Sequence, residues 1–196
     1  MLYLICNNEN SSEIVAQLLG YLENRNDPLI RDDLVLKIAI LAEKFAENLR
    51  WYVDVVVKLI KNAEVENDIW YRILQIITGF GTHNTELQSY AAHRMFAALS
   101  LPHVTDTMKC VGSYVVSEFS EELVKADKDP QKIFDAINRH FSTGDNKSKS
   151  MMLNAFAKLA IKYDFLKEQV EMICHMSSGH WDPDVQQRGV EFLILL

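Results

Sequence analysis

The sequence predicts an all-α protein, built as a right-handed solenoid of about five stacked helical pairs. Apolar residues recur every three or four positions along most of the chain. Glycine and proline are scarce, at 7 and 4 of 196 residues, and helix-start signals return at a nearly constant interval. We therefore expect one continuous body in which each helical pair covers the apolar face of the next.

The N-terminal elements are short. Residues 2–6 have no helix-start signal and are too few to be stable alone, so we interpret them as the end of a helix. Ser11 or Ser12 can cap the next helix, which is expected to end near Asn24. Residues 26–28, Asn-Asp-Pro, form the expected turn.

The long helix that follows, ending near Asn48, is apolar around most of its circumference. Its charged residues are confined to a narrow stripe made of Asp33, Lys37, Lys44 and Glu47. A helix on a protein surface needs only one apolar face. This helix is therefore expected to be covered by neighbours on more than one side, as in a stacked layer.

Residues 51–61 form the one ambiguous element, because their valines favour a strand by propensity. The charged residues decide the assignment. Asp54, Lys58 and Lys61 fall at i, i+4 and i+7, which places them on one face of a helix and the apolar residues on the other. We therefore expect a helix here.

The remaining helices follow from apolar periodicity and from start and stop signals. Asn67 or Asp68 can cap a helix that ends within residues 79–82. Thr85 begins a capping-box pattern in which Gln88 would reach back to the cap. Further helices are expected over residues 85–99, 106–123, 133–141, 151–160, 166–173 and 185–196.

The spacing of these helices indicates a repeat. The second helix of each pair has its start signal near Asp32, Asn67, Asp106, Asn146 and Asp182, so the intervals are 35, 39, 40 and 36 residues. Such intervals lie at the short end of HEAT and armadillo repeats, about 40 to 47 residues. In these architectures each helical pair buries its neighbour's apolar face. We expect residues 1–196 to form a single solenoid segment, excised from a longer solenoid because both ends are apolar helical sequence.

Composition excludes several classes of protein. The net charge of −7 argues against nucleic acid as a partner, because phosphate binding needs a basic face. Cys6, Cys110 and Cys174 are too widely spaced for the disulfide framework of a small secreted domain and indicate a reducing, cytoplasmic compartment. Since no apolar stretch reaches the roughly 20 residues of a membrane span, any membrane association is expected through partners or a surface patch.

Two groups of residues are candidates for chemistry. Cys174, His175 and His180 are the densest set of potential metal ligands, but their spacing is poor for zinc, and a buried cysteine beside two histidines at a helix end is the favoured interpretation. Glu118 lies between apolar neighbours, yet a general base also needs a cleft and a partner. We therefore expect either a buried, hydrogen-bonded structural carboxylate or simply an exposed one, and no enzyme, no cofactor, and no catalytic or metal-binding residue.

Two further groups are candidates for binding. Arg139, His140, Lys147 and Lys149 form the only local concentration of positive charge. They could contact an acidic lipid headgroup or an acidic partner, although a solvated loop between helices is favoured.

The second group consists of two aromatic pairs at corresponding helix starts, Trp51 with Tyr52 and Trp70 with Tyr71. Such pairs are compatible with a peptide-binding groove. Packing of one repeat against the next is favoured, because large aromatic side chains are mostly buried.

Several motifs resemble the adaptin family, and in particular the alpha subunit of the plasma-membrane clathrin adaptor. The motif Lys-Ile-Ala-Ile-Leu-Ala-Glu-Lys-Phe at 37–45, followed by Trp-Tyr-Val-Asp at 51–54, is similar to the middle-to-late trunk of alpha-adaptins. Similar motifs continue in order at residues 70–76, 88–92, 111–115 and 184–192. The resemblance covers nearly the whole chain, with departures at residues 80–86, 127–130 and 177–181.

The resemblance implies a structural scaffold segment of a clathrin adaptor large subunit, acting in endocytic vesicle formation and intracellular protein transport. It implies a heterotetramer with beta, medium and small chains, peripheral on the cytosolic face of the plasma membrane at clathrin-coated pits. Contact with the clathrin coat and the membrane would be indirect. In this family the phosphoinositide and cargo sites are expected outside the segment, so no ligand residue is carried over and the partner-binding residues stay unassigned.

Two alternatives remain open at this point. The first is a HEAT or armadillo-type interaction module of a non-vesicular complex, whose likeness to adaptins reflects only shared repeat physics. The second is an enzyme that uses Glu118 or the region of Cys174.

Overall fold

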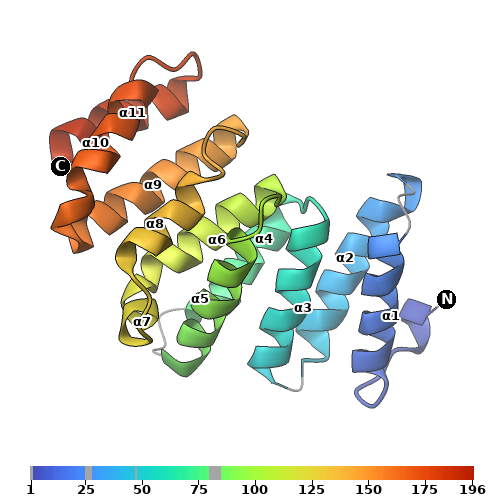
Figure 1. Cartoon of the computed structure of the whole chain (residues 1–196). Helices are drawn as coiled ribbons and strands as arrows, with labels where there is room; N and C mark the ends of the chain where they lie inside the picture. The colour runs from blue at the N-terminus through green and yellow to red at the C-terminus, as the bar shows by residue number, and fades with distance from the viewer. Residues whose placement is uncertain (1, 25–27, 47, 80–84) are drawn as a thin grey trace.

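The computed structural model describes residues 2–24, 28–46, 48–79 and 85–196, and within these ranges the chain forms helices and no strands. The helices are stacked side by side along the molecule, with the two termini at opposite ends (Figure 1). The predicted all-α solenoid is therefore confirmed.

Successive helices along the chain are joined by short connections. The described elements are η1 (Leu2–Ile5), α1 (Ser11–Asn24), α2 (Pro28–Lys44), α3 (Leu49–Asn62), α4 (Asn67–Thr78), α5 (Thr85–Leu99), α6 (Asp106–Glu118), α7 (Ser120–Lys125), α8 (Pro130–Asn138), α9 (Asn146–Lys162), η3 (Asp164–Leu166), α10 (Lys167–Ser177) and α11 (Pro183–Leu195).

These helices fall into five successive pairs, α1 with α2, α3 with α4, α5 with α6, α8 with α9, and α10 with α11, and the short α7 lies between the third and fourth pairs. The first helices of the pairs pack in one row, α1 on α3, α3 on α5 and α5 on α8. The second helices pack in another row, α4 on α6, α6 on α9 and α9 on α11 (Figure 1). The predicted number of about five pairs is thus confirmed.

The valine-rich segment is helical, as its charge spacing predicted. In α3 the side chains of Val53, Val55, Val56 and Val57 are all buried, and Asn48 caps the helix by accepting a hydrogen bond from the backbone N–H of Trp51 at 2.7 Å. Tertiary burial of the apolar face therefore outweighs the β propensity of valine.

The predicted helix over residues 106–123 is broken into two. Helix α6 ends at Glu118, and α7 begins after Phe119, whose φ of −101° and ψ of 27° are not helical. Ser117 and Ser120 donate hydroxyl hydrogen bonds to nearby backbone carbonyls at the break. Such side-chain hydrogen bonds compete with the backbone hydrogen bonds of a helix, and they cannot be predicted from the spacing of apolar residues.

Other helix boundaries also differ from the expectation. The N-terminal segment is a single 3₁₀ turn, Leu2–Ile5. Helix α2 begins at Pro28, ahead of the signal at Asp32, and ends at Lys44 rather than near Asn48. Helix α8 ends at Asn138, which leaves Phe141 in the following turn.

Several predicted N-caps are wrong, whereas one predicted helix end is confirmed. Ser11 and Ser12 lie inside α1 rather than before it. Helix α4 starts after Glu66, so Asn67 and Asp68 lie inside its first turn and do not precede it. Gln88 donates to the carbonyl of Thr78 on α4 at 3.4 Å instead of reaching back to a cap. Gly79 does end α4, because its φ of 70° is the left-handed conformation that terminates a helix.

Helix α2 is covered less completely than its narrow charged stripe predicted. Ile38 and Ala42 are fully buried, but Leu36 and Ile40 are 45% and 41% exposed. Lys37 and Asp33 form an ion pair along the polar stripe at 2.5 Å. The turn expected at residues 26–27, the charged residue at 47 and most of the loop at 80–86 lie outside the described residues.

Candidate interaction surfaces

Hydrogen bonds from one helical pair reach the start of the second helix of the next. The carboxylate of Glu64, in the loop before α4, accepts from the backbone N–H groups of Asp106 and Thr107 at 2.8 and 2.9 Å and from the Thr107 hydroxyl at 2.7 Å. The first N–H groups of a helix have no partner within it, and a carboxylate there is also favoured by the helix dipole. Glu64 therefore caps α6 from the preceding pair.

Asp106 repeats this arrangement one pair further along. Its Oδ1 accepts from the backbone N–H of Asp145 at 3.2 Å and the hydroxyl of Ser148 at 3.3 Å, both at the start of α9. Burial alone would raise the pKa of Asp106, but hydrogen bonds from Lys109, Asp145 and Ser148 and the charge of Lys109 hold that pKa below its ordinary value.

The buried Lys109 adds further hydrogen bonds between α6 and the segment before α9. We call such a set of polar contacts between successive helical pairs a joint. Its Nζ donates to Asp106 at 2.8 Å and to the backbone carbonyl of Thr143 at 3.0 Å. At the following pair, the side-chain amide of Asn146 donates to Asp182 at 3.0 Å, and Asp182 in turn caps α11 by accepting from the N–H groups of Asp184 and Val185. Three successive joints therefore link helix starts across pairs.

The basic cluster at the end of α8 belongs to another joint. Arg139 donates to the carbonyl of Ser100 at 2.5 Å, and the Nε2 of His140 lies 2.8 Å from the carbonyl of Leu99. These carbonyls end α5, and positive charge is favoured at a helix C-terminus. His140 is buried, so the favoured interpretation of a solvated loop is wrong for this residue.

The protonation of His140 is shaped by its surroundings. Burial lowers the pKa of its imidazole below the ordinary value, against the raising effect of the bond to Leu99, and the nearby charges of Lys109, Arg139 and His103 lower it further. Neutral His140 is therefore the form that fits the folded protein.

The other members of the basic cluster lie elsewhere. The Nζ of Lys147 lies 4.6 Å from the centroid of the Trp70 ring on α4, and Lys149 is half-buried on α9. Of the four residues, His140 is buried, Lys149 is half-buried, and Arg139 and Lys147 are exposed and contact different elements, the end of α5 and α4.

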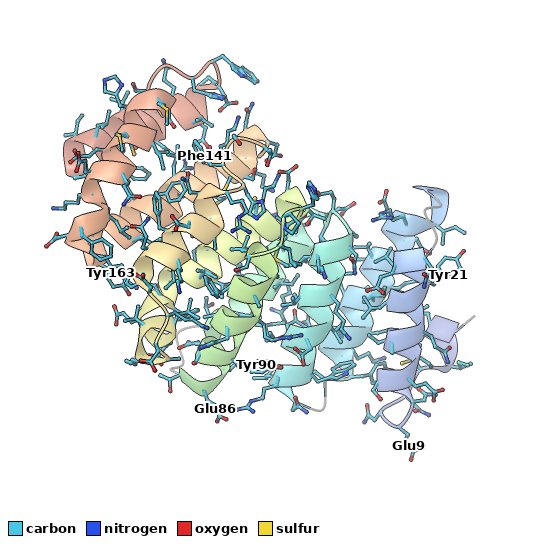
Figure 2. All side chains as sticks on the ribbon, viewed as in Figure 1. Glu9, Tyr21, Glu86, Tyr90, Phe141 and Tyr163 are labelled. Atoms are coloured by element: carbon cyan, nitrogen blue, oxygen red, sulfur yellow. The ribbon has the colours of Figure 1, made fainter. Side chains whose placement is uncertain are left out.

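Ion pairs join neighbouring helices along their sides. Arg50 on α3 pairs with Glu86 on α5. Asp54 on α3 accepts from the Tyr90 hydroxyl at 2.9 Å and pairs with Arg94 at 2.7 Å, both on α5. Glu86 and Tyr90 are labelled along α5 in Figure 2. These contacts keep α3 and α5 in register.

Glu118, the candidate general base, takes part in a contact of the same kind. It forms an ion pair with Lys158, which links α6 to α9, and the Nζ of Lys158 lies 4.6 Å from the centroid of the Tyr114 ring. The carboxylate is partly exposed, and the structural role favoured from the sequence matches this position.

The candidate metal ligands of the last pair do not converge. Cys174 is fully buried, and burial raises the pKa of its thiol to about 11, whereas the neighbouring His175 is exposed. His180 accepts a hydrogen bond from the backbone N–H of Asp182 at 3.1 Å through Nδ1. In the part of the chain that the structure describes, no group of three or more His, Cys, Asp or Glu residues could hold a metal ion.

The aromatic pairs mainly serve packing, as favoured from the sequence, with one exception. Tyr52 and Trp70 are buried and Trp51 is half-buried. Tyr71 is 54% exposed, with its ring stacked on that of Trp70 at a centroid distance of 4.0 Å. Consecutive residues of a helix point in different directions, so a Trp-Tyr pair cannot be buried as a unit by one neighbour.

Two grooves are features that sequence reasoning missed. One, of about 830 Å³, lies between α8 with the turn after it and α10, and Leu193 of α11 also lines it. The other, of about 340 Å³, lies across α6, α9 and α11 and is lined by residues that include Tyr114, Ile161 and Phe192. Both depend on how far apart successive helices are placed, and periodicity within one helix does not carry that information. No helix among the described residues is long and apolar enough to cross a membrane.

Comparison with known proteins finds relatives of one family along the whole chain. A family model described as the adaptin N terminal region matches residues 1–196. AP-2 complex subunit alpha-2 of Dictyostelium discoideum is 35% identical over 198 residues, covering 100% of this chain and 20% of that protein. AP-2 complex subunit alpha of Schizosaccharomyces pombe is 32% identical over 199 residues, covering 100% of this chain and 22% of that protein.

A relative of another kind is more distant. AP-1 complex subunit gamma-2 of Arabidopsis thaliana is 27% identical over 208 residues, covering 98% of this chain and 23% of that protein. The chain thus spans about a fifth of the length of these relatives. The resemblance carried by the motifs at 37–45 and 51–54 is confirmed over the whole sequence, and the chain belongs to the adaptin family.

Proposed function

We propose that this chain is a structural scaffold segment of a clathrin adaptor large subunit, acting in endocytic vesicle formation and intracellular protein transport. The observation that carries the proposal is the match to the adaptin N terminal region along all 196 residues, together with relatives named as alpha subunits of the AP-2 complex. Residues 1–196 would form one continuous stretch of the trunk of such a subunit.

The mechanism is mechanical rather than chemical. A solenoid presents an extended surface whose curvature is set by the small rotation between repeats. Here the polar joints at Glu64, Asp106 and Asp182 would set that rotation and keep it constant while partner subunits pack on the surface. Glu118 and Cys174, the candidates for catalysis, have structural surroundings that support a role without chemistry.

The proposed partners are the beta, medium and small chains of a heterotetrameric adaptor. Contacts with the clathrin coat and with the membrane would be made through other parts of that assembly. The proposed location is the cytosolic face of the plasma membrane at clathrin-coated pits, and the AP-2 alpha names of the relatives support this choice.

Imaging tests this proposal. The protein that contains residues 1–196 is tagged with a fluorescent protein at its own locus and viewed near the plasma membrane together with labelled clathrin. We expect transient spots that coincide with clathrin. A diffuse or nuclear signal without such spots would favour the alternative, an interaction module of a non-vesicular complex.

A further inference from the structure

The groove between α8 and α10 interrupts the regular stacking of the solenoid. Helix α10 packs closely on α11 and α9, whereas its approach to α8 leaves a groove of about 830 Å³. At one end the two helices are joined by a reciprocal amide pair, in which the side chains of Gln131 and Gln169 donate to each other at 3.0 and 2.9 Å.

The α8 side of the groove is rigid and aromatic. Phe134 and Phe141 line it, and both rings also pack on the buried Phe156 of α9, with centroid distances of 5.1 and 5.7 Å. Phe141 is labelled in Figure 2. Phe134 is only 2% exposed, so the half-buried Phe141 presents the aromatic surface, and a ring held in this way loses little side-chain freedom when a partner binds.

The α10 side is apolar and adaptable. Met172 and Met176, one turn apart, line the groove and are 57% and 70% exposed. Methionine side chains are flexible and polarisable, and they recur on surfaces that accept the apolar face of a helix. Together with the half-buried Phe141 they form an apolar surface of the kind that marks an interaction site, and the buried Phe134 lies at its base.

The rim of the groove is acidic. Glu168 and Glu171 both line it, and the nearby Lys167 lies 3.6 Å from Asp164, so its charge is partly balanced. The whole chain carries a net charge of −7. A partner with positive charge beside its apolar residues is therefore complementary to the groove, whereas a second copy of this acidic chain is not.

We propose that the groove between α8 and α10 binds a short amphipathic helix of a partner protein, with apolar side chains three and four residues apart and basic residues along its edges. Because two helices form the walls, a third helix would fill the gap as an additional member of the same packed layer. The apolar side chains of about two turns fit a groove of this size, within the usual range of binding pockets. This binding function goes beyond the scaffold role and does not require adaptor assembly.

The test uses designed peptides as probes and the full-length protein that contains residues 1–196 as the binding partner. A fluorescein-labelled 15-residue Leu/Lys/Ala peptide carries leucine every three or four residues, a second peptide has each lysine replaced by glutamate, and a third has the first composition in scrambled order. Fluorescence anisotropy is measured at physiological salt. We expect the lysine peptide to bind at least tenfold more tightly than either of the others.

Substitutions locate the binding. The double variant Met172→Asn, Met176→Asn removes apolar surface without a change in charge, and it should weaken binding of the lysine peptide at least fivefold. Ile194→Asn is the matched control, because Ile194 is 80% exposed on α11 and does not line the groove. The double variant Glu168→Gln, Glu171→Gln should reduce the preference for lysine over glutamate peptide at least threefold.

Three results would overturn the proposal. Equal binding of ordered and scrambled peptides would show attraction by charge alone. Undiminished binding by the methionine variant, with circular dichroism confirming that it is folded, would place the site elsewhere. A dimer seen by light scattering that only the methionine variant dissociates would assign the groove to a second copy of the chain.

Discussion

At the scale of single residues, a few polar side chains connect helices that apolar packing brings together. Glu64 and Asp106 each accept hydrogen bonds from backbone N–H groups at the start of a helix in the next pair. His140 and Arg139 contact backbone carbonyls at the end of α5, in the preceding pair. Each contact spans 39 to 43 residues of sequence, close to one repeat. The joints should therefore contribute to stability well beyond what exposed polar residues usually do.

Replacement of Glu64 by alanine tests the first joint. The variant loses three acceptor contacts at the start of α6, so we expect the free energy of unfolding to fall by about 1 to 2 kcal/mol. Glu66→Ala is the control from the same loop, because Glu66 makes no side-chain capping bond, and it should change stability by less than about 0.5 kcal/mol. Urea denaturation measures both. Equal losses in the two variants would contradict the capping role.

His140 gives the stability a defined dependence on pH. Its pKa is lowered in the folded state, mainly by burial, so the unfolded chain binds the proton more tightly. Stability from this residue is complete above the unfolded pKa, about 6.5, and is lost as the pH falls toward the folded pKa. We expect His140→Gln to reduce the change in unfolding free energy between pH 7 and pH 5. An unchanged slope would exclude His140 as the source.

At the scale of elements, close contact between α10 and α11 depends on a glycine. A Cβ atom at Gly189 would lie 2.8 Å from the backbone nitrogen of Ser178 and 2.9 Å from the carbonyl oxygen of Cys174. No flexible side chain is present there to move away. The last helical pair can therefore reach its observed separation only without a side chain at this position.

Two glycine-to-alanine changes with opposite expected signs test this packing. Gly189→Ala should force α10 and α11 apart and lower the free energy of unfolding by about 1 to 3 kcal/mol. At Gly20, within α1, an added Cβ meets no atom within 4 Å, so Gly20→Ala should stabilise the protein by about 0.5 to 1 kcal/mol. Thermal denaturation of both variants measures the difference. Stabilisation by Gly189→Ala would show that the two helices are not so closely packed.

The sequence predicted the existence of helices better than their ends. The helical spacing of the charged residues, with the apolar residues on the opposite face, identified α3 despite its valines, because burial of one face is a property of the segment itself. The break at Phe119 and the contact of Gln88 with Thr78 could not be predicted, since the first depends on local serine hydrogen bonds and the second on a neighbouring helix. Terminal residues of helices are determined by such contacts.

At the scale of the whole molecule, the repeat interval of 35 to 40 residues was sufficient to predict a solenoid. The interaction surfaces were not predictable in the same way. Met172 and Met176 have the periodic spacing of core residues, yet they are exposed because α10 lies apart from α8. Conversely, Arg139 and His140 look like a basic surface patch, but both contact backbone carbonyls at the end of α5, in the preceding pair.

The central claim is that this chain belongs to a scaffold subunit of a clathrin adaptor, and co-purification tests it most directly. The full-length protein that contains residues 1–196 is affinity-tagged at its own locus, and its partners are identified by mass spectrometry. We predict recovery of one beta, one medium and one small adaptor chain in equal amounts with the tagged subunit. Recovery of none of the three would contradict the account.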